Sequence, residues 1–300
     1  MKLGLEYSND PNEFYVRVNS PSRKFDDLRT EFNNDAFLLK NTFSDMYVAF
    51  SSGVDSQVIT RCFLDNNINA EYVFLNCVGY SDYELAHVRE CEKFYGIRVR
   101  IINLNIDEFK EAWTKESKNE NSGYFSHYIF GWLSKNLEKD YPIVTQGPNE
   151  PNIVHYNNEV SIWCNYYEAM NRRVNLMKQY RPVIDFPFSP ESIASYYSDD
   201  GVQTYCKTVR YYHESNVSLP ISQYYNTFGK APVKGKYFKD DIIWYGKRTG
   251  YEQFPTWFFS APMITETMIS MPYWDLIDFM TTKVDLYRDY SDWKYGDISG

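Results

Sequence analysis

Cysteine is scarce in this 300-residue chain, and the few cysteines present form no recognisable motif. The five are Cys62, Cys77, Cys91, Cys164 and Cys206, and no two have C-x-x-C spacing. Their odd number and scatter argue against a disulfide framework and against a zinc or iron–sulfur site. A long apolar run is also lacking, since none approaches the roughly 20 residues of a membrane span. Because the first residues do not resemble a signal peptide either, we expect a reduced, cytoplasmic protein without a membrane anchor.

Positive charge is in deficit, with 31 Lys and Arg against 40 Asp and Glu and a net charge of −9. This balance argues against a protein that binds nucleic acid over its whole surface, although a local basic patch remains possible. Such a patch is present between residues 230 and 248, which contain several lysines, Arg248 and interspersed glycines. It is either a basic loop over an active site or an ordinary surface loop. A small-molecule partner is therefore favoured over nucleic acid, and a homodimer is compatible with the sequence.

The most informative stretch is 46–57, read as MYVAFSSGVDSQ. Residues 46–50 are uncharged and favour a buried parallel strand. Residues 51–56 are mostly small and polar, and residues 57–66 have the apolar spacing of a helix. A strand, a short turn and a helix start direct free backbone N–H groups and the positive end of the helix at one point. This pattern predicts an anion site, to which three serine hydroxyls would add donors.

Residues 51–56 resemble the S-G-G-x-D-S loop of the PP-loop ATP pyrophosphatases, with Ser52 in place of the first glycine. The resemblance implies that ATP phosphates bind at Ser51, Ser52, Gly53, Val54, Asp55 and Ser56. It also implies Mg²⁺ beside Asp55, because Mg²⁺ prefers oxygen ligands and often bridges substrate phosphates. The alternative is a serine-rich N-terminal cap on an ordinary helix.

The flanking pattern predicts an α/β fold with an open, mainly parallel sheet covered by helices on both faces, as in adenine nucleotide α-hydrolases. Strands are expected at 72–75, 97–102 and 142–145. Helices are expected at 26–43, from Ser81 to Gly96, at 106–116 and at 124–137. A hairpin of 3–7 and 14–18 would be added to one edge of the domain. The division predicted is a nucleotide-binding domain at 1–155 and a mostly helical substrate or lid region at 156–300.

Further site residues follow from the same resemblance. Asn76 and Cys77, at the end of the second strand, would lie near adenine or ribose. Gly147 would lie beside the α-phosphate or ribose, and Glu150 would assist the metal, unless 146–152 is a plain surface loop. Basic residues would hold the phosphates or stabilise the transition state, unless they only form a solvated helix face. These are Arg172, Arg173, Lys178 and Lys247.

The implied activity is adenylation, in which ATP is cleaved to AMP and pyrophosphate to activate a small metabolite or nucleobase for amidation or a related substitution. The chain is similar to the PAPS reductase-like, deazaguanine synthase-like and asparagine synthetase-like branches but lacks their extra cysteine motifs, as a divergent stand-alone member would. Two alternatives stay open. One is a degenerate nucleotide-binding or assembly module, suggested by Ser52, and the other is an enzyme that modifies tRNA or DNA.

Overall fold

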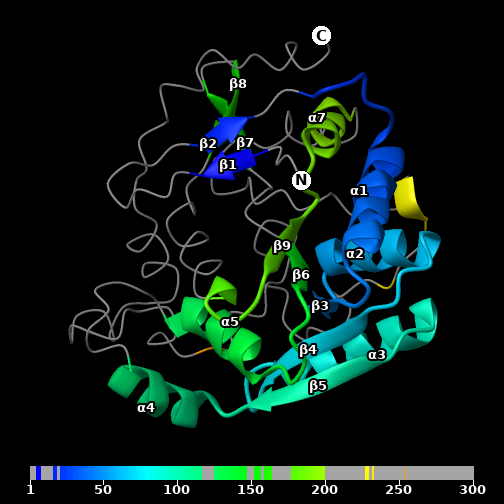
Figure 1. Cartoon of the computed structure of the whole chain (residues 1–300). Helices are drawn as coiled ribbons and strands as arrows, with labels where there is room; N and C mark the ends of the chain where they lie inside the picture. The colour runs from blue at the N-terminus through cyan, green and yellow to red at the C-terminus, as the bar shows by residue number, and fades with distance from the viewer. Residues whose placement is uncertain are drawn as a thin grey trace.

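The computed structural model shows an α/β fold built on one five-stranded sheet (Figure 1). It describes residues 5–7, 16–18, 21–116, 125–146, 152–156, 159–163, 177–199, 227–229, 232 and 254. Residues 262–282, whose apolar residues predict a further helix from the sequence, lie outside these ranges. No helix within the described ranges is long and apolar enough to cross a membrane.

The central sheet is parallel throughout, which confirms the predicted fold class. Its strands are β3 (Tyr47–Ala49), β4 (Glu71–Cys77), β5 (Val99–Leu104), β6 (Ile143–Gln146) and β9 (Val183–Phe186). They lie in the order β5-β4-β3-β6-β9, so β3 is in the middle. The register pairs Val48 with Tyr72 on one side and with Val144 on the other. Because the strands are parallel, all their carboxyl ends lie along the same edge of the sheet.

Both faces of the sheet are covered, as apolar residues on both faces of the strands require. One face packs against α1 (Leu28–Thr42), α2 (Val54–Asp65), α3 (Glu84–Tyr95) and α7 (Pro190–Ser198) in a single buried cluster. The other face packs against α4 (Ile106–Glu116) and α5 (Phe125–Asn136), as Figure 1 shows. Val48 faces the first group and its neighbour Tyr47 faces the second. This two-sided burial holds the middle strand, and the loop after it, in a fixed position.

Local sequence signals explain most helix ends. Asp27 caps α1 by accepting a hydrogen bond from Thr30 N at 3.0 Å. Gly96 ends α3 in the left-handed conformation, with φ of 66°, as its position after the helix predicts. Ser189 caps α7 with Pro190 in the first turn, as the sequence of serine followed by proline favours. The helix after the loop begins at Val54 rather than Gln57, because Gly53 already acts as its N-cap.

The carboxyl half differs from the sequence expectation in two ways. Residues expected to start a long helix from Val160 instead form β8 (Glu159–Trp163), which pairs antiparallel with β7 (Asn152–Tyr156). The alternation of Val160 and Ile162 with polar Ser161 is the strand signal that explains this. In addition, β9 pairs with β6 and completes the central sheet, so the sheet does not end at residue 155. The predicted boundary at 155/156 would therefore separate β9 from the other four strands of the central sheet.

The N-terminal hairpin is present but does not extend the central sheet. Its strands are β1 (Leu5–Tyr7) and β2 (Val16–Val18), and they pair antiparallel as expected. They form a separate two-stranded sheet. The predicted hairpin is therefore confirmed, and it is separate from the central sheet.

Candidate anion-binding site

The candidate site lies where the order of the sheet reverses. From β3 the chain passes through α2, β4 and α3 to β5 on one side, and then returns through α4 and α5 to β6 on the other side of β3. In open parallel sheets, ligands bind outside the carboxyl ends of the strands at such a switch point. The loop 51–53 follows β3 at this point. The chain that follows β6, including Gly147 and Glu150, lies outside the described residues.

The loop presents backbone donors at the start of α2. Gly53 is the N-cap, and the first ladder bond of the helix runs from Gln57 N to Gly53 O at 3.1 Å. The N–H groups of the first turn consequently have no acceptor within the helix. The N–H of Gly53 makes a long contact of 3.3 Å with Ser51 Oγ. A Cβ at Gly53 would also lie 3.3 Å from Ser51 Oγ, so glycine keeps this approach open. The arrangement suits an anion such as a phosphate.

The three serines of the loop have different surroundings. Ser51 is exposed, with its hydroxyl 3.4 Å from Ser56 Oγ. Ser56 is buried, and its hydroxyl donates to Gly53 O at 3.1 Å. Ser52 is fully buried, and its hydroxyl has no hydrogen-bond partner among the described residues. The prediction that all three hydroxyls face a ligand is therefore too broad, because only Ser51 lies at the surface.

Ser52 has the backbone conformation that normally selects glycine. Its φ is +57°, in the left-handed region, where a side chain costs roughly 1–2 kcal/mol. Serine replaces the first glycine of the S-G-G-x-D-S pattern at this position. The backbone nevertheless has a positive φ and not the negative φ that is usual for serine. Ser52 therefore strains the loop while preserving its left-handed turn.

We expect Ser52→Gly to raise the free energy of unfolding by about 1 kcal/mol. It would relieve the left-handed strain and remove a buried hydroxyl without a partner, and these gains are partly offset by the greater freedom of glycine in the unfolded chain. Asn67→Gly is the matched control, because Asn67 also has positive φ, at 51°, but asparagine tolerates it. Urea unfolding measures both variants. An equal or smaller gain for Ser52→Gly would show that the loop is not strained.

Asp55 lies in the first turn of α2 and is half-buried. An acidic residue here is stabilised by the positive end of the helix. Within the described ranges, no group of three or more metal-ligating side chains is found. Asp55 is the loop residue that could contribute a ligand to Mg²⁺, which is often bound by one or two carboxylates together with substrate phosphates.

Asn76 and Cys77 use their side chains inside the protein. The Asn76 amide donates to Asp82 Oδ1 at 2.9 Å and to Asn103 Oδ1 at 3.0 Å, and accepts from Ser81 Oγ. Cys77 packs in the cluster beneath α4 and α5, where burial raises the pKa of its thiol to about 12. Asn76 thus braces the turn after β4, and Cys77 is a core thiol. The structure does not present either side chain to a ligand.

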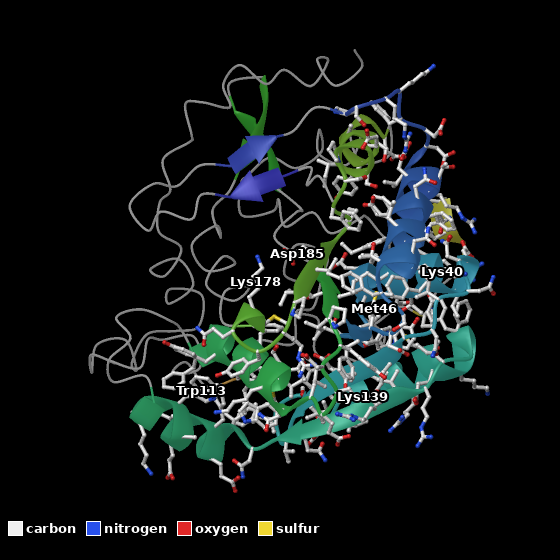
Figure 2. The ribbon with its side chains drawn as sticks, in the orientation of Figure 1. Lys40, Met46, Trp113, Lys139, Lys178 and Asp185 are labelled. Carbon is white, nitrogen blue, oxygen red and sulfur yellow. The ribbon has the colours of Figure 1, made fainter. Side chains whose placement is uncertain are left out.

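Lys178 is not brought to the loop. Figure 2 shows it on the turn that leads into β9, and its side chain is exposed. The preceding Met177 belongs to the buried cluster of Tyr47 and Ile143, the first residues of β3 and β6. The chain at Lys178 therefore lies near the edge where the strands begin, opposite the loop. A catalytic role for Lys178 does not fit this placement, while Arg172, Arg173 and Lys247 lie outside the described residues.

Three polar residues that were not predicted from the sequence support the loop from the protein interior. Gln57, His87 and Tyr95 are all buried. Gln57 Nε2 donates to Ser52 O at 3.0 Å, and His87 Nε2 lies 3.0 Å from the same oxygen. Tyr95 OH donates to Gln57 Oε1 at 2.9 Å. The sequence signal that could have indicated this cluster is a glutamine at the start of an apolar helix face, beside Val58 and Ile59.

Comparison with known proteins does not identify a function for this chain. No protein-family model matches the chain, and no curated protein matches it. One similar solved structure is described as a predicted subunit of tRNA methyltransferase from Methanocaldococcus jannaschii. It is 18% identical, with 47% of this chain and 68% of that chain covered and a TM-score of 0.29. A likeness this distant carries no functional argument. The structure itself establishes an open, parallel α/β fold with a helix-start loop at its switch point.

Proposed function

We propose that this chain is an ATP-dependent adenylating enzyme of the PP-loop type. A substrate oxygen would attack the α-phosphorus of ATP, the bond from the α-phosphorus to the bridging oxygen would break, and pyrophosphate would leave. A nitrogen or sulfur nucleophile would then displace AMP from the activated substrate. The substrate class is a small metabolite or nucleobase.

The observation that carries this proposal is the loop at 51–56. It lies at the switch point, it opens α2 with first-turn amides that have no acceptor within the helix, and it has a left-handed turn at Ser52. The amides and the exposed Ser51 would bind the phosphates that become pyrophosphate. Asp55 would hold Mg²⁺, which neutralises charge on the leaving group when bound.

The backbone conformation of Ser52 argues against the alternative of a degenerate nucleotide-binding module. Loss of glycine at this position would disable the loop if it changed the backbone turn. The turn is retained, with φ of +57°, and the amides of the first turn remain at the edge of the sheet. We therefore favour a functional loop over a degenerate one.

The test is to identify the products of ATP labelled separately at the α- and γ-phosphates. The protein is incubated with Mg²⁺, labelled ATP and fractions of a metabolite pool, and tRNA is added in a parallel series. AMP and pyrophosphate are expected with one metabolite fraction, whereas ADP and phosphate would contradict the proposed bond cleavage. Products that require tRNA would assign nucleic-acid modification. ATP binding without products in any series would favour the degenerate module.

A further inference from the structure

Gln57 uses both N–H bonds and the oxygen of its side-chain amide in hydrogen bonds. It is almost completely buried, at 1% exposure. Its nitrogen donates to Ser52 O at 3.0 Å and to Pro232 O at 3.1 Å, which uses both of its N–H bonds. Its oxygen accepts from Tyr95 OH at 2.9 Å. The amide therefore has one orientation, fixed from three sides.

The hydrogen bond to Ser52 O determines where the next N–H group points. In a planar trans peptide the C=O of one residue and the N–H of the next point in opposite directions. Gln57 and His87 both approach the carbonyl oxygen of Ser52 from the buried side of the loop. The N–H of Gly53 is consequently turned away from the buried side of the loop. It points toward the carboxyl edge of the sheet, where an anion would lie.

The same side chain connects the loop to a distant part of the chain. Arg29 donates to Thr227 O at 3.4 Å, and Phe228 is buried in the core that includes Phe32. Thr227 and Phe228, a few residues before Pro232, are thus in contact with α1. Because both N–H bonds of Gln57 are used, the amide cannot turn toward one carbonyl without losing the other.

We propose that Gln57 is a positioning residue that aims the Gly53 N–H at the anion and couples this geometry to its hydrogen bond with Pro232 O. This role rests on the proposed function of the loop. Gln57 itself touches no substrate and acts through the Ser52–Gly53 peptide. Tyr95 fixes which way the Gln57 amide faces, and His87 provides the second contact to the Ser52 carbonyl.

The test compares variants in binding of inorganic pyrophosphate and of Mg²⁺-ATP. Gln57→Met keeps the length of the side chain but removes the donors, and we expect about 10-fold weaker pyrophosphate binding, the lower range for losing a supporting hydrogen bond behind a ligand-binding group. Tyr95→Phe keeps the ring and should weaken binding less. Ser134→Ala is the control, because it removes a buried hydrogen bond to Met177 O on the opposite face of the sheet. Its binding should match the wild type.

A second readout needs no ligand. The Gly53 amide resonance should move in Gln57→Met and stay in place in Ser134→Ala. An unmoved resonance, together with pyrophosphate binding equal to the control, would overturn the positioning role. If Gln57→Met does not fold, wild-type binding and an unmoved Gly53 resonance in Tyr95→Phe would overturn it. If the wild type binds neither pyrophosphate nor ATP, the proposed function fails, and with it any role of Gln57 in anion binding.

Discussion

Asp55→Asn is expected to weaken binding of Mg²⁺-ATP by at least about 100-fold, which corresponds to roughly 3 kcal/mol, while binding of metal-free ATP is kept or strengthened. The two effects have opposite signs because the Asp55 carboxylate would attract Mg²⁺ but repel bare phosphates. The fold should survive, since the substitution is isosteric and affects a half-buried residue in the first turn of α2. Titration of ATP with and without Mg²⁺ measures both values.

The control for this result is Asp65→Asn at the other end of the same helix. Asp65 pairs with Arg29 at 2.7 Å and lies away from the loop. It should affect stability slightly and leave the Mg²⁺ dependence of ATP binding unchanged. A folded Asp55→Asn protein whose ATP binding still responds to Mg²⁺ as in the wild type would remove the metal role of Asp55.

Arg181→Met is expected to lower the free energy of unfolding by about 3 kcal/mol, because buried polar groups would lose their partner. The guanidinium is nearly buried and donates to the backbone oxygens of Ser134, Leu137, Lys139 and Tyr141, at 2.7 to 3.1 Å. It also lies 5.3 Å from the centre of the Tyr47 ring. Burial lowers the pKa of this guanidinium from its usual value. Arg181 therefore connects the backbone at the end of α5 to the backbone just before β6.

Lys178→Met provides the comparison for Arg181→Met. Lys178 is a nearby basic residue with an exposed side chain, so its replacement should change stability by less than about 0.5 kcal/mol. Arg181→Lys should fall between the two, because one ammonium group cannot reach all of these carbonyl oxygens. The shift in urea midpoint at a constant m-value measures each effect. Equal midpoints for Arg181→Met and Lys178→Met would refute the structural role of Arg181.

The parts of the fold that the sequence predicted are those governed by neighbouring residues. The apolar run before Ser51 and the helical spacing after Gln57 are local patterns, and they predicted β3, the loop and α2. Gly96 and Ser189 marked helix ends for the same reason. The parallel sheet followed from alternating strands and helices with short connections.

The features missed by the sequence depend on contacts between distant residues. The short strand β9 is stabilised by pairing with β6, which no local pattern around Val183 reveals. Arg181 was not predicted as a structural residue, because no local pattern indicates its partners. Its actual partners are backbone carbonyls that become available only when α5 ends beside it. Gln57 is a similar case, since its contact with Pro232 O joins residues far apart in the chain.

The most direct test of ATP binding at the loop is to follow backbone amide resonances while Mg²⁺-ATP is added. We expect the largest saturable shifts at residues 51–56, with Gly53 and Val54 foremost, and we expect pyrophosphate to shift the same amides. Saturable shifts confined to other parts of the sheet edge, or no shifts with either ligand, would contradict the assignment of this loop as the phosphate site.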